Sequence, residues 1–232
     1  MERPLDGDAS MASTGTWGLH HRRTAMADVY YQNREEAANR LADRLAETEW
    51  SAPVVLGVPR GGVPMAEIIA ARLGAALDVV LVHKIRAPGN PEYAIGSVDE
   101  SGHVTLSDHA TASVDDEAVR REIEEEKSVL ATRRRRYGQP RQPLSGRDVI
   151  IVDDGAATGA TIEAAINAVR GANAASVSIA LGVAAPEVVQ QLEQMADHVV
   201  CPSQPAGFMA VSQAFNEFPQ VSDREVERIL SG

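Results

Sequence analysis

The sequence has little cysteine and no long apolar run. Cys201 is the single cysteine among 232 residues, which excludes an intramolecular disulfide and a cysteine metal cluster. No run approaches the roughly 18 apolar residues that a membrane-spanning helix needs, and the first thirty residues hold no apolar stretch of the signal-peptide kind. We therefore expect a cytoplasmic protein that does not associate with membranes, with Cys201 in its core.

Positive charge is also scarce, because the 22 lysines and arginines are outnumbered by 33 acidic residues. The net charge is −11. Such a protein repels nucleic acids and anionic membranes on average, and neither is expected as a partner. An anionic small substrate would need a local basic pocket. Two nucleotide-binding motifs are absent as well, G-x-G-x-x-G after a strand and G-x-x-x-x-G-K-S/T, so neither a dinucleotide-binding fold nor a P-loop enzyme is predicted.

The composition and periodicity of what remains indicate one domain. Residues 1–26 show neither a helical nor a strand period and are rich in Gly, Ser, Thr and charge, which predicts a flexible tail. Residues 27–232 are expected to form a single domain, because 44% of the chain is hydrophobic, enough to bury a core.

Short β-branched runs alternate with helical patterns along this domain, which is typical of an α/β fold with a parallel sheet and helices on both faces. A long loop or hairpin with a short strand at 103–106 is expected from Arg86 to about Asp116. The arginines at 133–136 are expected to end a charged helix in solvent, with an anion-binding patch as the alternative. The predicted strands are 53–58, 77–85, 149–152, 176–183 and 198–201, and the main predicted helices are 34–48, 65–74, 115–136, 161–170, 186–195 and one from 222.

The stretch DVIIVDDGAATGAT, residues 148–161, carries the clearest chemical signal. In parallel sheets ligands bind at the carboxyl ends of strands, and here a buried strand delivers Asp153 and Asp154 to that edge. Paired carboxylates suit vicinal hydroxyls or a divalent cation. The small-residue loop that follows opens a helix and offers backbone N–H groups to an anion, with Thr158 and Thr161 as hydroxyl donors. This layout predicts a ribose 5-phosphate site, although an ordinary strand-to-helix turn with an aspartate cap fits the same spacing.

The stretch VIIVDDGAATGAT resembles the phosphoribosyl pyrophosphate (PRPP) signature of type I phosphoribosyltransferases. GVPRGGVPMA, HKIRAPGNPEYAIGSVDESG and FMAVSQAFNEFPQVSDREV are similar to a bacterial and archaeal group of these enzymes whose acceptor is poorly defined. The resemblance implies a type I fold, with a central five-stranded parallel sheet, a flexible loop or hairpin within residues 86–107 and a small hood region. It also implies transfer of phosphoribose from PRPP to a nucleobase-like or small amine acceptor, with release of pyrophosphate.

By position, the resemblance implies that Asp153 and Asp154 bind the ribose hydroxyls. Arg60, Gly61 and Lys84 would bind pyrophosphate, with Arg60 and Lys84 as the catalytic cations and a non-proline cis peptide in the Arg60–Gly61 loop. Magnesium would be held through PRPP rather than by direct protein ligands, with Asp153 or Asp154 as the alternative. Homodimers are common in the family. The residues implied to bind the 5-phosphate are Ala156, Ala157, Thr158, Gly159, Ala160 and Thr161.

One departure concerns the acceptor. Purine-salvage members carry an acid where this chain has Ala157, which disfavours a 6-oxopurine acceptor. Glu92 and Tyr93 are candidates for orienting the acceptor or for stabilising a loop. The aromatic residues Phe208, Phe215 and Phe218 either shape a hood or pack against the last helix.

Two other functions compete with the transferase. The first is a non-catalytic regulator of the same fold that senses PRPP or nucleotides. A regulator could lose Arg60 or the mobile loop, and this chain keeps both. The second is a sugar-phosphate phosphohydrolase with Asp153 as nucleophile, although the further acids that such an enzyme needs are absent from the sequence pattern.

Overall fold

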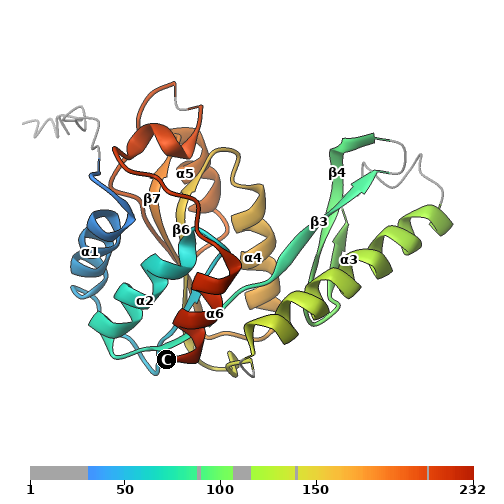
Figure 1. Cartoon of the computed structure of the whole chain (residues 1–232), viewed down its shortest axis with the longest axis horizontal. Coiled ribbons are helices and arrows are strands. Elements are labelled where there is room, and N and C mark those ends of the chain that lie inside the picture. Colours follow the sequence, from blue (N-terminus) through green and yellow to red (C-terminus); the bar gives the residue numbers. More distant parts are fainter. Residues whose placement is uncertain (1–30, 88–89, 107–115, 139–140, 208) are drawn as a thin grey trace, which may run out of the picture.

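A five-stranded parallel sheet forms the centre of the protein in the computed structural model, which describes residues 31–87, 90–106, 116–138, 141–207 and 209–232 (Figure 1). The predicted tail therefore lies outside the described residues. The five parallel strands confirm the predicted fold class, and their order is β2-β1-β6-β7-β8. The strands are β1 (Val54–Gly57), β2 (Ala76–Val79), β6 (Asp148–Ala156), β7 (Ser176–Ala184) and β8 (His198–Val200).

Helices cover both faces of this sheet, and β6 shows why. Its residues Val149 and Ile151 pack into the cluster that includes α4 (Ala160–Gly171) and α5 (Pro186–Leu192). The alternate residues Ile150 and Val152 pack on the other face with α1 (Arg34–Leu45) and α2 (Gly62–Leu73). Successive side chains of a strand point to opposite faces, so a central strand must be apolar throughout. The predicted burial of residues 149–152 on both faces is confirmed.

A second, antiparallel sheet stands beside the first, and the sequence predicted it only in part, as a loop or hairpin after Arg86 with a short strand at 103–106. It comprises β3 (Val82–Ala87), β4 (Asn90–Asp99) and β5 (Val104–Leu106), and it packs against α3 (Asp116–Tyr137) (Figure 1). The single strand predicted at 77–85 is wrong, because the chain leaves the parallel sheet after Val79 and enters the antiparallel sheet at Val82. The apolar run continues through this change of sheet, since Val80 and Leu81 are also buried.

The long excursion predicted after Arg86 is a hairpin with a ten-residue strand, β4. Gly96 does not mark a turn. A Cβ atom at this position would lie 2.3 Å from the carbonyl oxygen of Thr105, so glycine permits β5 to approach β4 closely. Glycine is therefore needed for packing between strands rather than for chain reversal.

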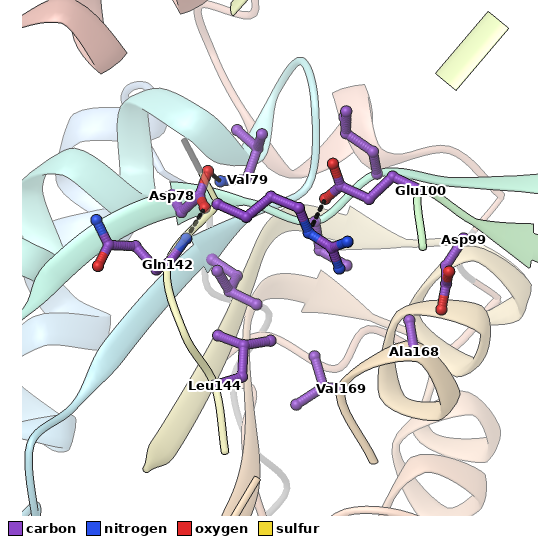
Figure 2. A pocket seen from close by; sticks show the side chains of 12 residues that line it. Asp78, Val79, Asp99, Glu100, Gln142, Leu144, Ala168 and Val169 are labelled. Atoms are coloured by element: carbon purple, nitrogen blue, oxygen red, sulfur yellow. Dashed lines mark hydrogen bonds and ion pairs between the residues drawn. The ribbon is translucent and has the colours of Figure 1, made fainter. Parts of the chain in front are cut away.

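The antiparallel sheet and α3 are joined to the central sheet by a buried ionic cluster. Arg134 of α3 donates from Nη1 to Asp78 of β2 at 2.7 Å and from Nε and Nη2 to Glu100 after β4, at 2.6 and 2.7 Å. Asp78 also accepts from the backbone N–H groups of Val79 and Gln142. Figure 2 shows Asp78 between these two residues, with Glu100 on the opposite side of a small cavity of about 20 Å³.

The four arginines at 133–136 therefore do not form the solvated helix end that was predicted. The Nη1 atom of Arg133 lies 3.2 Å from the Nε2 atom of His83. Arg136 forms ion pairs with Asp223 and Glu227 of α6 (Asp223–Ser231). Arg135 is exposed and donates to Thr132 of its own helix. Arg135 and Arg136 are exposed as predicted, but Arg136 is paired with α6, and Arg133 and Arg134 are half-buried.

Within the part of the chain that the structure describes, no helix is both long and apolar enough to cross a membrane. Cys201 is buried, as predicted, and its Sγ atom lies 3.3 Å from the carbonyl oxygen of Ser203.

Candidate active site

The loop after β6 encloses a cavity of about 190 Å³ at the carboxyl edge of the central sheet. Asp153 and residues 155–162 line it, and this set includes all six residues expected at a 5-phosphate. Gly159 ends the loop with a φ of 77°, a left-handed conformation that glycine adopts readily, and α4 begins at the next residue. The chain thus turns sharply enough to aim the start of a helix at the cavity.

Backbone N–H groups are the main hydrogen-bond donors of this loop. Because Gly159 precedes α4 and has no side chain, no side-chain hydrogen bond caps the first turn of the helix. The N–H groups at a helix start carry partial positive charge and lack partners within the helix, which favours an anion there. The side chains of Ala157, Thr158 and Thr161 are exposed, and all three residues line the cavity.

The two neighbouring carboxylates differ in environment. Asp153 faces the cavity, and its Oδ1 accepts a hydrogen bond from the backbone N–H of Asp154 at 2.9 Å. Burial holds the pKa of Asp153 well above its usual range, and the nearby charge of Asp154 raises it further. Burial also raises the pKa of Asp154, but Arg34 opposes that shift. The pair is therefore strained electrostatically, which costs stability and is typical of functional sites.

Asp154 points away from the cavity toward Arg34, the first residue of α1. Both Nε and Nη2 of Arg34 lie 2.8 Å from Oδ2 of Asp154. No sequence pattern signals this pair, because 120 residues separate the two and Arg34 looks like an ordinary first-turn residue of a helix. Arg34 is the site residue that sequence reasoning missed.

The turn between β1 and α2 approaches the same carboxylates. The peptide bond between Pro59 and Arg60 is cis, as the resemblance implied for this loop. A Cβ atom on Gly61 would lie 1.9 Å from Oδ2 of Asp154, and one on Gly62 would lie 2.2 Å from the carbonyl oxygen of Val152. The double glycine thus lets this turn lie directly against the end of β6.

The two expected catalytic cations lie outside the loop cavity. Arg60 is exposed, and its Nη1 atom is 4.0 Å from the carboxylate of Asp223 at the start of α6. Lys84 is exposed on β3 and lines a groove of about 240 Å³ between the antiparallel sheet and α4. This groove shares Ala160 with the loop cavity. Lys84 therefore lies beside the loop rather than at the end of a parallel strand.

The aromatic residues near the C-terminus pack against the N-terminal segment rather than against the last helix. Phe215 lies 5.4 Å from Tyr31 and 4.9 Å from Phe218, measured between ring centroids. The Tyr31 hydroxyl donates to the carbonyl oxygen of Gly182 in β7. Phe208 and the side chain of Glu92 lie outside the described residues, and Tyr93 is 52% exposed on β4.

Oxygen donors at this edge suit a hard divalent cation. Magnesium binds through one or two carboxylates and the phosphates of a substrate, and it keeps several waters. Asp153 and Asp154 could supply that limited protein share. Among the described residues no group of three or more Asp, Glu, His or Cys side chains gathers into a complete metal site. The donor set therefore fits an ion carried largely by its ligand.

Comparison with known proteins identifies the family. The family described as "Phosphoribosyl transferase domain" matches residues 26–209 of this chain. The chain belongs to the phosphoribosyltransferase family, and the α/β fold with its five-stranded parallel sheet agrees with the type I class.

Proteins from Mycobacterium tuberculosis and Thermus thermophilus are among those similar to this chain. A relative from Mycobacterium tuberculosis strain H37Rv, named "Putative phosphoribosyl transferase Rv0571c", is 41% identical over 204 residues, as is its counterpart in strain CDC 1551. The match covers 86% of this chain but 46% of each relative, so the chain spans about half the length of these proteins. The crystal structure of TT1426 from Thermus thermophilus is 44% identical, with a TM-score of 0.80, and the match covers 87% of this chain and 98% of that one.

Proposed function

We propose that this protein is a Mg²⁺-dependent phosphoribosyltransferase that takes phosphoribose from PRPP, releases pyrophosphate, and passes the sugar to a nucleobase-like or small amine acceptor. The observation that carries the proposal is the loop cavity of about 190 Å³. There a carboxylate, Asp153, and the start of a helix face one small space. These groups are the partners that a ribose hydroxyl and its 5-phosphate need.

The proposed roles follow from these positions. The backbone of the loop that ends at Gly159 would bind the 5-phosphate, and the carboxylates of Asp153 and Asp154 would accept hydrogen bonds from the ribose hydroxyls. Arg60 and Lys84 would bind the leaving pyrophosphate. Because both side chains are exposed and outside the cavity, each would have to turn toward the bound donor.

In the proposed reaction, the bond between C1 of the ribose and the pyrophosphate oxygen breaks, a bond from C1 to the acceptor nitrogen forms, and that nitrogen releases its proton to water. Negative charge grows on the departing oxygen, and positive charge spreads over C1 and the ring oxygen. Arg60 and Lys84 would stabilise the first, and the carboxyl oxygens of Asp153 and Asp154 would stabilise the second. When bound, magnesium would neutralise the pyrophosphate oxygens.

Asp153→Asn tests the donor site. We expect this nearly isosteric change to weaken PRPP binding about 10- to 100-fold, because it removes a charged acceptor from the ribose hydroxyl. Stability should be kept or raised, since one of two adjacent buried carboxylates is gone. Calorimetric titration of PRPP with Mg²⁺ measures the affinity, and thermal unfolding measures the stability.

The matched control for this experiment is Asp43→Asn, the same change at an exposed carboxylate of α1 that pairs with Arg72. It should leave PRPP affinity within about twofold of wild type. Equal affinity of wild type and Asp153→Asn would remove Asp153 from the donor site.

A further inference from the structure

The contacts of Arg34 connect three separate segments of the chain. Its Nε and Nη2 atoms lie 2.8 Å from Oδ2 of Asp154, and its Nη1 donates to the carbonyl oxygen of Pro219 at 2.7 Å. The centre of the guanidinium lies 3.7 Å from the centroid of the Phe218 ring. Arg34 thus ties the start of α1 to the end of β6 and to the segment that precedes α6.

The pair between Arg34 and Asp154 is largely shielded from water, with side-chain exposures of 12% and 13%. A buried pair of this kind contributes little net stability, because removing two charges from water costs about as much as their attraction returns. Such a pair instead fixes the orientation of its two side chains relative to each other. A guanidinium held by a carbonyl oxygen and an aromatic ring offers a fixed fork to a carboxylate.

Asp154 has limited room for further hydrogen bonds. A carboxylate can accept about four of them. Nε of Arg34 donates a hydrogen bond to Oδ2, and Nη2 forms an ion pair with the same oxygen. Gly61 packs against the same carboxylate without supplying a side chain. Oδ2 is therefore engaged by Arg34, and the acceptor capacity that remains lies mainly on the other oxygen, Oδ1, whose direction follows from the fixed position of Oδ2.

We infer that Arg34 is a positioning residue, which orients the carboxylate of Asp154 so that its remaining acceptor position meets one hydroxyl of the ribose. This inference rests on the proposed function, because it assumes that the site binds the ribose of PRPP. Phe218 and Pro219 hold Arg34 in turn, so the segment before α6 supports the ribose site through this one side chain.

The charges around Asp154 agree with this role. Arg34 from α1 and Asp153 from the same strand act on it, while the β1–α2 turn and the C-terminal segment contribute the uncharged groups of Gly61, Phe218 and Pro219. Arg34 is thus the cation that offsets both the burial of Asp154 and its repulsion from Asp153. A neutral residue in its place would leave the carboxylate without an oriented partner.

Three phosphate compounds test the inference through a difference in affinity: ribose 5-phosphate and its analogues that lack the 2-hydroxyl or the 3-hydroxyl. The wild-type protein should bind ribose 5-phosphate at least about tenfold more tightly than either analogue. In Arg34→Gln, the preference over one of the two analogues should fall to about twofold or less. Affinity for that analogue itself should stay close to wild type, since it cannot use Asp154.

Matched variants separate positioning from general damage. Arg44→Gln makes the same change at an exposed position of α1 and should keep both preferences. Arg34→Lys keeps the charge but not the fork, and should restore the preference only in part. In an Asp154→Asn background, Arg34→Gln should cause no further loss of preference. If Arg34→Gln does not fold, Phe218→Leu, which removes the ring beneath the guanidinium, should show a smaller loss of the same preference.

Two results would overturn the inference. One is an unchanged preference in Arg34→Gln, or in Phe218→Leu if that variant must be used. The other is an equal loss of affinity for all three compounds, which would make Arg34 a structural residue only. Failure of the wild-type protein to bind ribose 5-phosphate and PRPP is a different result, because it contradicts the donor site itself and the inference falls with it.

Discussion

Replacing Arg134 by methionine is expected to lower the free energy of unfolding by about 3 to 5 kcal/mol, the usual cost of breaking a buried ion pair from one side. Arg134 bonds to Asp78 and to both oxygens of Glu100, and the two carboxylates are 4% and 8% exposed. Methionine fills similar space without charge. Asp78 would keep its two backbone N–H partners, and Glu100 would keep Arg141 at 3.7 Å, so two buried carboxylates would lose their main counter-charge.

Urea denaturation followed by circular dichroism measures this loss of stability as a lower urea concentration at the midpoint of unfolding. Arg135→Met is the control, because this neighbour is exposed and donates only to Thr132 among the described contacts. Its effect should stay within about 0.5 kcal/mol. If the two variants were equally stable, the cluster around Asp78 would not be what holds α3 and the antiparallel sheet to the central sheet.

Gly61→Ala is expected to weaken PRPP binding about 100-fold. The new Cβ atom would lie 1.9 Å from Oδ2 of Asp154, a distance at which one of the two must move. The carboxylate cannot turn aside freely because Arg34 holds the same oxygen. Either Asp154 or the turn carrying Arg60 is displaced, and a shift of about 1 Å among ligand-binding groups can cost two orders of magnitude.

Gly171→Ala is the matched control for this substitution. It lies in α4, where a Cβ atom would meet nothing closer than 3.9 Å, so affinity should be unchanged and stability slightly raised. The affinities are measured by calorimetric titration of PRPP with Mg²⁺. Full affinity in Gly61→Ala would show that the turn and Asp154 do not act together at the donor.

The central sheet and the small-residue loop that ends at Gly159 could be predicted from sequence because their signals are local. The run Val149–Val152 is apolar on both faces, which a central parallel strand requires, and the small residues up to Gly159 leave the loop backbone open. The spacing of apolar residues was sufficient to predict the strand, and the small size of the side chains was sufficient to predict the open loop. The positions of Asp153 and Asp154 at the sheet edge followed from the same strand.

The antiparallel sheet could not be predicted from the same kind of signal. Residues 77–85 form one largely apolar stretch, and no turn residue marks the change of sheet between Val79 and Val82. Glycine at position 96 permits the close approach of β5, a role that its sequence context does not indicate. As a consequence, Lys84 was expected at a parallel strand end and instead lies on β3, beside the loop cavity.

The environment of the two carboxylates could not be predicted from the sequence either. Asp153 and Asp154 are adjacent in sequence and look equivalent, yet one faces the cavity and the other faces Arg34. The difference depends on α1 and on the segment near Phe218, which reach the site only in the folded chain. A sequence pattern can place two carboxylates at an edge, but tertiary contacts decide what each one does.

The most direct test of the account is release of pyrophosphate from PRPP in the presence of Mg²⁺, across a panel of nucleobases and small amines. We expect at least one acceptor to stimulate release, and Asp153→Asn to suppress that stimulation. Tight binding of PRPP with no release for any acceptor would contradict a transferase and would favour a protein that senses PRPP.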